Sequence, residues 1–313
     1  MIAKIIPASN WMYTRLTYYL VFVGWAFYAI LSFLSPVSGI NGSRLPFDDI
    51  FFVRGTVMLI ILAIMLLAAR GATAFKSYAV MIKGSKEATA IDLIANGLLL
   101  TLSYFLISTV FGALIPFYVK SPGYDALVVI RDHIPAAISL GAYFLLYRGS
   151  DQLRKVANFE TWTKGSAFIM FIFMIFAYIF VLSFTKFQTP PPNVGQATAL
   201  TVLPLNVLLF TLILPFLLAW FLGILATINI FKFSNSVQGK LYRLALKDLI
   251  KGLWFVIVLS MLIQFLSLSY KYLLTLKLGA LLTIIYVLLI LYGVGFMFVR
   301  AGAKRLSMLE EAG

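Results

Sequence analysis

The feature that most constrains this chain is a series of apolar runs of about twenty residues or more, separated by short charged or Pro/Gly-rich breaks. Wound as a helix, about twenty residues span about 30 Å, the thickness of the hydrocarbon core of a bilayer. A soluble domain of this length carries about twice the 12% of charged residues found here. The runs therefore predict an all-α polytopic membrane protein with little chain outside the membrane.

Eight transmembrane helices are expected from the positions of the runs. The segments are Thr17–Pro36, Ile50–Ala69, Leu93–Val119, Ala126–Tyr147, Ser166–Thr185, Ala199–Phe231, Leu249–Tyr270 and Leu278–Val299. The sixth is longer than a bilayer requires, so we expect it to tilt or to begin with a turn around Pro204. The first is longer and more aromatic than a signal-peptide core, so we count it as a span.

Basic residues are distributed unevenly between the two sides of the expected membrane. If both termini lie on one side, that side collects most of the 25 Lys and Arg residues. They are Lys4, Arg15, Arg70, Lys76, Lys83, Lys86, Arg148, Arg154, Lys155, Lys164, Lys232, Lys240, Arg243, Lys247, Lys251, Arg300, Lys304 and Arg305. Because basic residues in short loops favour the cytoplasm, we expect a multi-pass protein of the cell (inner) membrane with both termini cytoplasmic.

The same distribution explains the net charge of +14. A collar of Lys and Arg at the cytoplasmic surface suits anionic lipid headgroups, which are the expected partners. No DNA-binding or RNA-binding signature accompanies the charge, so nucleic acid is not an expected partner. A membrane-protein partner stays open.

Scarce residues recur in the same order in the two halves of the chain, which indicates an internal duplication. Each half has a Trp followed at the same spacing by Leu-Ser-Phe, then Phe-Lys followed at the same spacing by Asp-Leu-Ile, then Gly, Phe and Arg at a fixed spacing. These sets begin at Trp11 and Trp162, at Phe75 and Phe231, and at Gly141 and Gly293.

The duplication predicts two four-helix transmembrane repeats, residues 1–157 and 158–313. Because four is an even number of crossings, both repeats enter the membrane from the same side. The expected architecture is thus a 4+4 bundle of parallel repeats related by an axis along the membrane normal. A path for a solute between the halves and a fused dimer with no path both fit this arrangement.

One cluster of charged residues breaks the duplication. Arg54, Arg131, Asp132 and His133 are expected one to two turns inside the outer surface, and their counterparts near Phe210 and Ile284 are apolar. Charges at membrane depth are costly and usually paired or functional. The cluster is predicted to be either a salt bridge that fixes helix packing or a binding or proton-sensing site, since histidine titrates near neutral pH.

Other polar residues fall on the third and seventh segments. Asp92 and its apparent mate Asp248 are expected at helix N-termini, where a carboxylate caps free N–H groups; proton or cation binding is the alternative. Helical spacing places polar residues on one stripe of each segment: Asp92, Asn96 and Ser103, and Ser260, Gln264 and Ser267. Such stripes either hold helices together by hydrogen bonds or line a hydrated pathway.

Several kinds of chemistry are excluded or unsupported by the composition. With no cysteine and the single histidine His133, the chain has no disulfide, no thiolate metal site and no bis-histidine haem. Phosphate-loop, zinc-hydrolase and serine-hydrolase motifs are absent. We therefore expect no catalytic residues, no metal site and no cofactor, and a protein that is not an enzyme.

Two functions remain. The first, favoured by the frequency of duplication among transporters, is a small-solute or ion transporter or permease. The second is a non-catalytic sensor, assembly factor or partner subunit that binds another membrane protein or a lipid. Prolines at Pro135, Pro204 and Pro215 are expected to interrupt the fourth and sixth segments, but two lack counterparts in the other half, which weakens the transporter hypothesis. A dry apolar seam between the halves would count against transport, and a wet cavity reaching Asn96 or Gln264 would favour it.

Overall fold

The structure, a computed structural model, describes residues 8–34, 47–114, 117, 122–160, 162–186, 203–237, 239–268 and 278–311. Within these ranges the chain is a bundle of long helices, with no strand. The long helices are α1 (Ala8–Leu34), α2 (Phe47–Met81), α3 (Lys86–Leu114), α4 (Tyr124–Ala157), α5 (Lys164–Lys186), α8 (Leu214–Ser236), α9 (Lys240–Leu268) and α11 (Leu278–Glu311). The short α7 (Leu205–Leu208) and a π-helical turn, η4 (Leu209–Ile213), lead into α8.

Six helices of the described part are long and apolar enough to cross a membrane, which confirms the class of multi-pass helical membrane protein. The candidate spans are Met12–Leu34, Gly55–Met81, Glu87–Phe111, Tyr124–Ala157, Asn206–Ser236 and Tyr286–Leu306. In α5, a shorter apolar stretch, Lys164–Ala177, is found. The first half of α9 carries Lys247, Asp248 and Lys251, which lower its hydropathy.

Three helices, α2, α4 and α11, continue well beyond the apolar segments expected from the sequence, and α11 runs to Glu311 where Val299 was expected as the end. The second segment was expected to end at Ala69 and the fourth at Tyr147, whereas α2 runs to Met81 and α4 to Ala157. Hydropathy falls at the first charged residue, but a helix does not end there when its inner face remains apolar. Along the extension of α2, Ala72, Phe75 and Ala79 are buried at helical spacing.

Local chemistry fixes the turns at one end of the bundle. Between α2 and α3, Gly84 has a φ of +102°, which favours glycine, and the Ser85 hydroxyl accepts the N–H of Ala88 at 3.1 Å as an N-cap. After α4, Asn158 adopts the left-handed conformation at the C-cap. The Thr163 hydroxyl then accepts the N–H of Ser166 at the start of α5.

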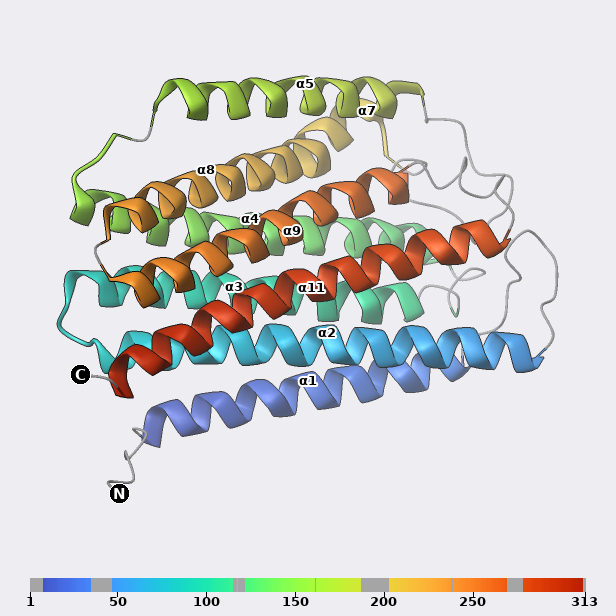
Figure 1. The fold of residues 1–313 in the computed structure, drawn as a ribbon. Helices are drawn as coiled ribbons and strands as arrows, with labels where there is room; N and C mark the ends of the chain where they lie inside the picture. Colours follow the sequence, from blue (N-terminus) through green and yellow to red (C-terminus); the bar gives the residue numbers. More distant parts are fainter. Residues whose placement is uncertain are drawn as a thin grey trace.

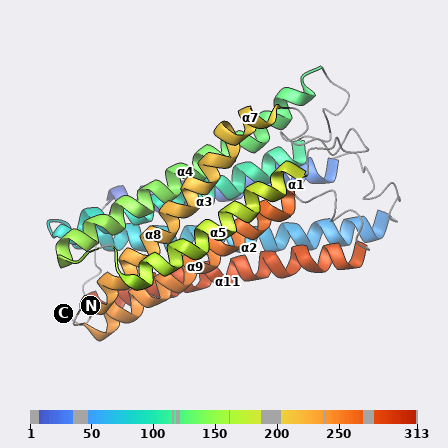
Figure 2. The same ribbon diagram turned by 90° about the horizontal axis from the view of Figure 1, so that it is seen from above.

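The helices lie roughly alongside one another in a single elongated bundle, and α1 begins at the same end where α11 finishes (Figure 1). The pairs α3 with α4 and α9 with α11 pack along their lengths. Each fourth helix also crosses to the other half of the chain, α4 against α8 and α11 against α2. The helix α1 packs against α2 and α3, and α5 lies along the outside of α8 (Figure 1 and Figure 2).

Glycines allow the tightest helix contacts. A Cβ at Gly149 of α4 would lie 2.6 Å from the carbonyl oxygen of Ala90 in α3, and a Cβ at Gly302 of α11 would lie 2.6 Å from that of Ala245 in α9. One heptad away, Gly97 of α3 and Gly252 of α9 meet the facing helices equally closely. Small residues that let helix backbones approach are the usual means of packing in membranes.

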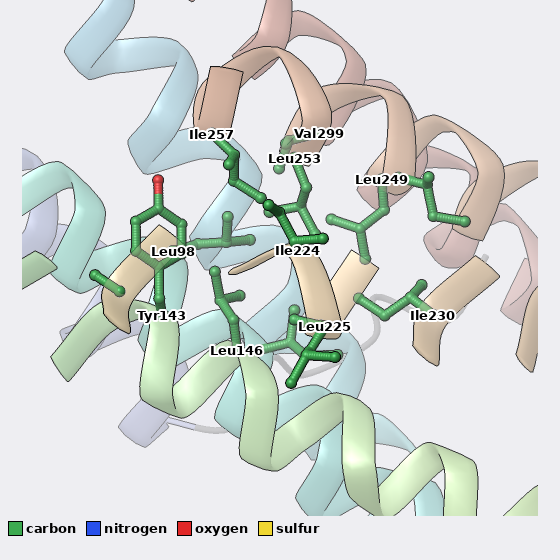
Figure 3. Close-up of a cluster of buried hydrophobic side chains, with 14 of the residues drawn as sticks. Leu98, Tyr143, Leu146, Ile224, Leu225, Ile230, Leu249, Leu253, Ile257 and Val299 are labelled. Carbon is green, nitrogen blue, oxygen red and sulfur yellow. The ribbon is translucent and has the colours of Figure 1, made fainter. Parts of the chain in front are cut away.

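The seam between the two halves is apolar where the structure describes it. Tyr143 and Leu146 of α4 pack with Ile224 and Leu225 of α8 and with Ile257 of α9, all nearly inaccessible (Figure 3). These residues come from both halves of the chain, so both halves contribute to one core.

Two of the prolines act differently from each other. The N–H of Leu214 bonds to the carbonyl oxygen of Leu209, five residues back, so the helix entering α8 is wound as a π-turn immediately before Pro215. Pro215 has no N–H, so the normal ladder is interrupted there. Pro135 was expected to interrupt the fourth segment, but it lies inside α4, which is continuous. A helix buried among neighbours tolerates proline because packing holds it together.

Candidate functional site

Along the seam between the two halves, α4 carries polar side chains at separate levels of the helix. Nearest the end opposite the chain termini, His133 lies in α4 with its Nδ1 2.8 Å from the Val129 carbonyl oxygen and its Nε2 2.8 Å from the Thr211 hydroxyl. Thr211 belongs to the π-turn η4, and it also donates to the Val207 carbonyl oxygen at 2.8 Å. Such π-turns are frequent at functional sites.

The two histidine contacts define how its proton can be arranged. Since a carbonyl oxygen only accepts, Nδ1 carries the proton towards Val129. In neutral His133, Nε2 then accepts from the Thr211 hydroxyl; in the cation, Nε2 donates, and Thr211 donates to Val207 instead. Turning the one hydroxyl of Thr211 therefore satisfies both ring nitrogens in either arrangement.

Two further residues of the predicted outer cluster precede His133 directly in α4. Arg131 and Asp132 form a two-pronged pair with each other, at 2.6 Å and 3.1 Å. The side chain of Arg54 lies outside the described part, so its place in the cluster stays a prediction. The described residues thus form two units on α4, an ion pair and a histidine that contacts α4 and η4.

At the middle level, Tyr143 of α4 and Ser260 of α9 share a hydrogen bond of 3.3 Å across the two halves. Ser260 also donates to the Ile257 carbonyl oxygen of its own helix, at 2.8 Å. Ser103 likewise bonds within its helix, to the carbonyl oxygen of Leu99. The Gln264 side chain, predicted for the same stripe as Ser260, lies outside the described part.

We call the end of the bundle where α1 begins and α11 finishes the terminal end. Closer to that end, Asn229 of α8 donates to the Ser150 hydroxyl of α4 at 3.4 Å. Both residues are fully buried, and the Asn229 side-chain oxygen has no hydrogen-bond partner. An unpaired buried carbonyl of this kind costs about 1–3 kcal/mol. It is one of the few polar side-chain atoms of the described core without a partner.

Asp92 forms a small network with the neighbouring helix. Its carboxylate pairs with the Lys76 ammonium of α2, and the Asn96 amide bonds to both, at 3.2 Å to each. The predicted grouping of Asp92 with Asn96 is therefore found, and Lys76 completes it. Lys76 also lies 5.5 Å from the centre of the Tyr13 ring of α1, so the network connects α1, α2 and α3.

Asp248 has a different partner, Arg305 of α11, at 2.7 Å. Neither aspartate lies at a helix N-terminus as expected, because α3 begins at Lys86 and α9 at Lys240. The carboxylates lie about two turns further in and pair with side chains of neighbouring helices.

The tight helix contacts explain why the two aspartates point to different helices. Ala90 and Ala245 occupy corresponding contacts, as do Gly97 and Gly252. When α3 and α9 are aligned by these contacts, Asp92 of α3 matches Lys247 of α9. Asp248 is thus one residue beyond the position that corresponds to Asp92. Successive residues in a helix lie about 100° apart, so Asp92 faces α2 whereas Asp248 faces α11.

A pocket of about 530 Å³ opens at the terminal end of the bundle, where the two halves meet. It is lined by Tyr78, Glu87, Ala157, Phe233, Ser236, Val237 and Tyr242. These residues come from the ends of α2, α4 and α8 and the beginnings of α3 and α9. Pockets of about 300–1,000 Å³ accommodate small organic ligands.

In the described part of the chain, no three His, Asp or Glu side chains come close enough to hold a metal ion. The sequence did not single out Lys76, Tyr143, Thr211, Asn229, Tyr242 or Arg305 as members of these polar groups. Asn229, within a long apolar run, was the one with a visible signal. The others acquire their roles from partners on distant helices, which spacing along one segment cannot predict.

The chain matches no protein-family model, no curated protein and no solved structure.

Proposed function

We propose that the chain crosses the membrane eight times as two parallel four-helix repeats, residues 1–157 and 158–313. The packing supports this: exchanging α2, α3 and α4 for α8, α9 and α11 reproduces the same set of helix pairs. The glycine contacts of α3 with α4 also correspond to those of α9 with α11. The termini of the helical bundle lie at one end, as an even number of crossings requires (Figure 1).

Cysteine labelling tests this topology cleanly, because the chain has no cysteine of its own. Lys83→Cys and Glu160→Cys lie on exposed turns at the terminal end, and Gly123→Cys lies on an exposed turn at the other. In intact cells, a membrane-impermeant maleimide should label Gly123→Cys, and the other two should react only after permeabilisation. Labelling of Gly123→Cys and Glu160→Cys from the same side would refute the four-helix unit.

For the activity, we propose a non-catalytic sensor, assembly factor or partner subunit that binds a ligand or another membrane component. The observation that carries this proposal is the apolar filling of the seam by Tyr143, Leu146, Ile224 and Ile257. A conducting path between the halves would need polar, hydrated walls at that place. The accessible pocket instead lies beyond one end of the seam, which is a place for binding.

The test is the reactivity of cysteines along the seam, using a small water-soluble thiol reagent on protein in proteoliposomes. Leu146→Cys and Ile224→Cys should react at less than about one tenth of the rate of Lys83→Cys, because they are buried among apolar side chains. Ser236→Cys, at the pocket, should react nearly as fast as Lys83→Cys. Rapid labelling at both seam positions would contradict the proposal.

Transport of a small solute or ion is the second candidate. It is favoured by the polar side chains at three levels of α4, His133, Tyr143 and Ser150, each bonded to the other half. These levels would form an interrupted path that opens when the halves move. The same labelling distinguishes the two, since a transporter exposes its seam to water during the cycle.

The remaining proposals concern the surroundings. We propose the cell (inner) membrane, cytoplasmic termini and anionic lipid headgroups around the basic terminal end, because Lys and Arg concentrate there. No enzymatic activity is proposed: the Thr211 hydroxyl lies beside Nε2 of His133, but the other ring nitrogen of that histidine faces a backbone carbonyl oxygen and not a carboxylate that would orient it as a base.

A further inference from the structure

The pocket at the terminal end has a defined chemical character. Its polar groups are the Glu87 carboxylate and the hydroxyls of Tyr78, Ser236 and Tyr242, and its apolar walls include Phe233. Elements of both halves contribute, so a ligand there contacts α2, α3 and α4 as well as α8 and α9.

Tyr242 places an unused hydrogen-bonding group in this pocket. Its hydroxyl oxygen is buried and has no hydrogen-bond partner. Burial raises the pKa of Tyr242 above its ordinary range, and the nearby Glu87 carboxylate raises that pKa further. The hydroxyl is therefore neutral, and its oxygen can accept a proton donor while its hydrogen is donated elsewhere.

Glu87 provides the charge. Its carboxylate is partly buried in the first turn of α3, and no ion pair joins it to another side chain that the structure describes. Glu87 is the one charged side chain among the lining residues, so the lining itself carries a carboxylate and no cation.

The aromatic walls favour the same type of ligand. The rings of Phe233 and Tyr242 lie 6.1 Å apart and stand at 87° to each other, and Tyr78 completes the aromatic lining. Ring faces attract cations, which is how proteins recognise ammonium groups. The guanidinium of Arg243, the residue after Tyr242, is held at the edge of the pocket, where it donates to the carbonyl oxygen of the lining residue Val237 at 2.8 Å.

We propose that this pocket binds a protonated amine, with its ammonium group between the Glu87 carboxylate, the Tyr242 hydroxyl oxygen and the ring of Phe233. An ammonium N–H would satisfy the unused Tyr242 oxygen, which a quaternary ammonium cannot do. The inference rests on the proposed function, since it names the ligand class of a binding protein. The amine can be a free small molecule or the headgroup of an aminophospholipid.

The free-amine arm measures thermal stability in a non-ionic detergent with increasing ethanolamine, and with choline for comparison. Ethanolamine should raise Tm in a saturable way. Glu87→Gln should weaken ethanolamine binding about tenfold or more, since a charge-assisted hydrogen bond is lost. Tyr242→Phe should weaken ethanolamine and leave choline unchanged. Asp125→Asn, at the opposite end of the bundle, and Tyr19→Phe alter exposed residues away from the pocket and should bind as the unaltered protein does.

The lipid arm compares nanodiscs containing phosphatidylethanolamine with nanodiscs containing phosphatidylcholine, at equal content of anionic lipid. A higher Tm with phosphatidylethanolamine that disappears in Glu87→Gln, without an effect of free ethanolamine, would support the headgroup as the source. Tyr242→Phe without ligand should keep or raise Tm, since it removes an unpaired buried hydroxyl, which verifies that the variant folds.

An absence of stabilisation by both amine sources would overturn the inference, as would stabilisation that Glu87→Gln does not reduce. The seam labelling is independent of this result. A failed binding assay with an unreactive seam leaves the proposed function in place without this ligand. Amine binding with a reactive seam would retain the site and overturn the function.

Discussion

Replacing Gly149 with alanine should lower the free energy of unfolding by about 2 kcal/mol, although alanine is the better helix former by about 1 kcal/mol. The added Cβ would lie 2.6 Å from the Ala90 carbonyl oxygen and 3.1 Å from the Ile94 nitrogen. Those are backbone atoms, so no side chain can rotate to relieve the overlap, and α3 and α4 must separate. The loss is measured by unfolding in mixed micelles with increasing SDS, and valine should cost more than alanine.

The matched substitution in the other half is Gly302→Ala, which brings a Cβ equally close to the Ala245 carbonyl oxygen. If the two halves are repeats, its cost should resemble that of Gly149→Ala. Gly165→Ala is the control, because a Cβ there meets nothing within 4 Å in the first turn of α5, and its stability should be unchanged or higher. Equal effects at Gly149 and Gly165 would refute the close contact.

The apolar runs predicted the existence and order of the helices well, because the bilayer imposes a length and hydropathy that few other structures require. They predicted helix ends poorly. The helix α2 passes Ala69 and ends at Met81, since its inner face stays apolar while charged residues occupy the other faces. Hydropathy measures transfer into lipid, whereas a helix outside the hydrocarbon needs only one buried face.

The side-chain partners were largely beyond what the sequence could predict. In a membrane helix apolar residues cover the outer face as well as the inner one, so periodicity does not show which face packs. Asn96 with Asp92 was predicted because both lie on one helix, four residues apart. His133 with Thr211 joins distant segments, and nothing in either segment names the other. The pairing depends on how α4 crosses the helix that contains η4.

Arg305→Ala should lower the free energy of unfolding by about 2 kcal/mol more than Asp248→Asn does, although both substitutions remove the same ion pair. The Asp248 side chain is 9% exposed and that of Arg305 is 39% exposed. Removing the arginine leaves a buried charge unpaired, which costs about 3–5 kcal/mol when burial is complete and less here because the pair lies near the surface. Asparagine keeps the shape and carries no charge, and the arginine left behind can turn towards water.

Unfolding in mixed micelles measures both variants, with Arg300→Ala as the control because Arg300 is an exposed arginine of the same helix. The double variant Arg305→Ala/Asp248→Asn should recover most of the stability that Arg305→Ala loses, because the penalty belongs to the unpaired carboxylate and disappears with its charge. If Arg305→Ala costs no more than Arg300→Ala, then Asp248 gains nothing from its partner. In that case its burial against α11 would have to be explained by packing alone.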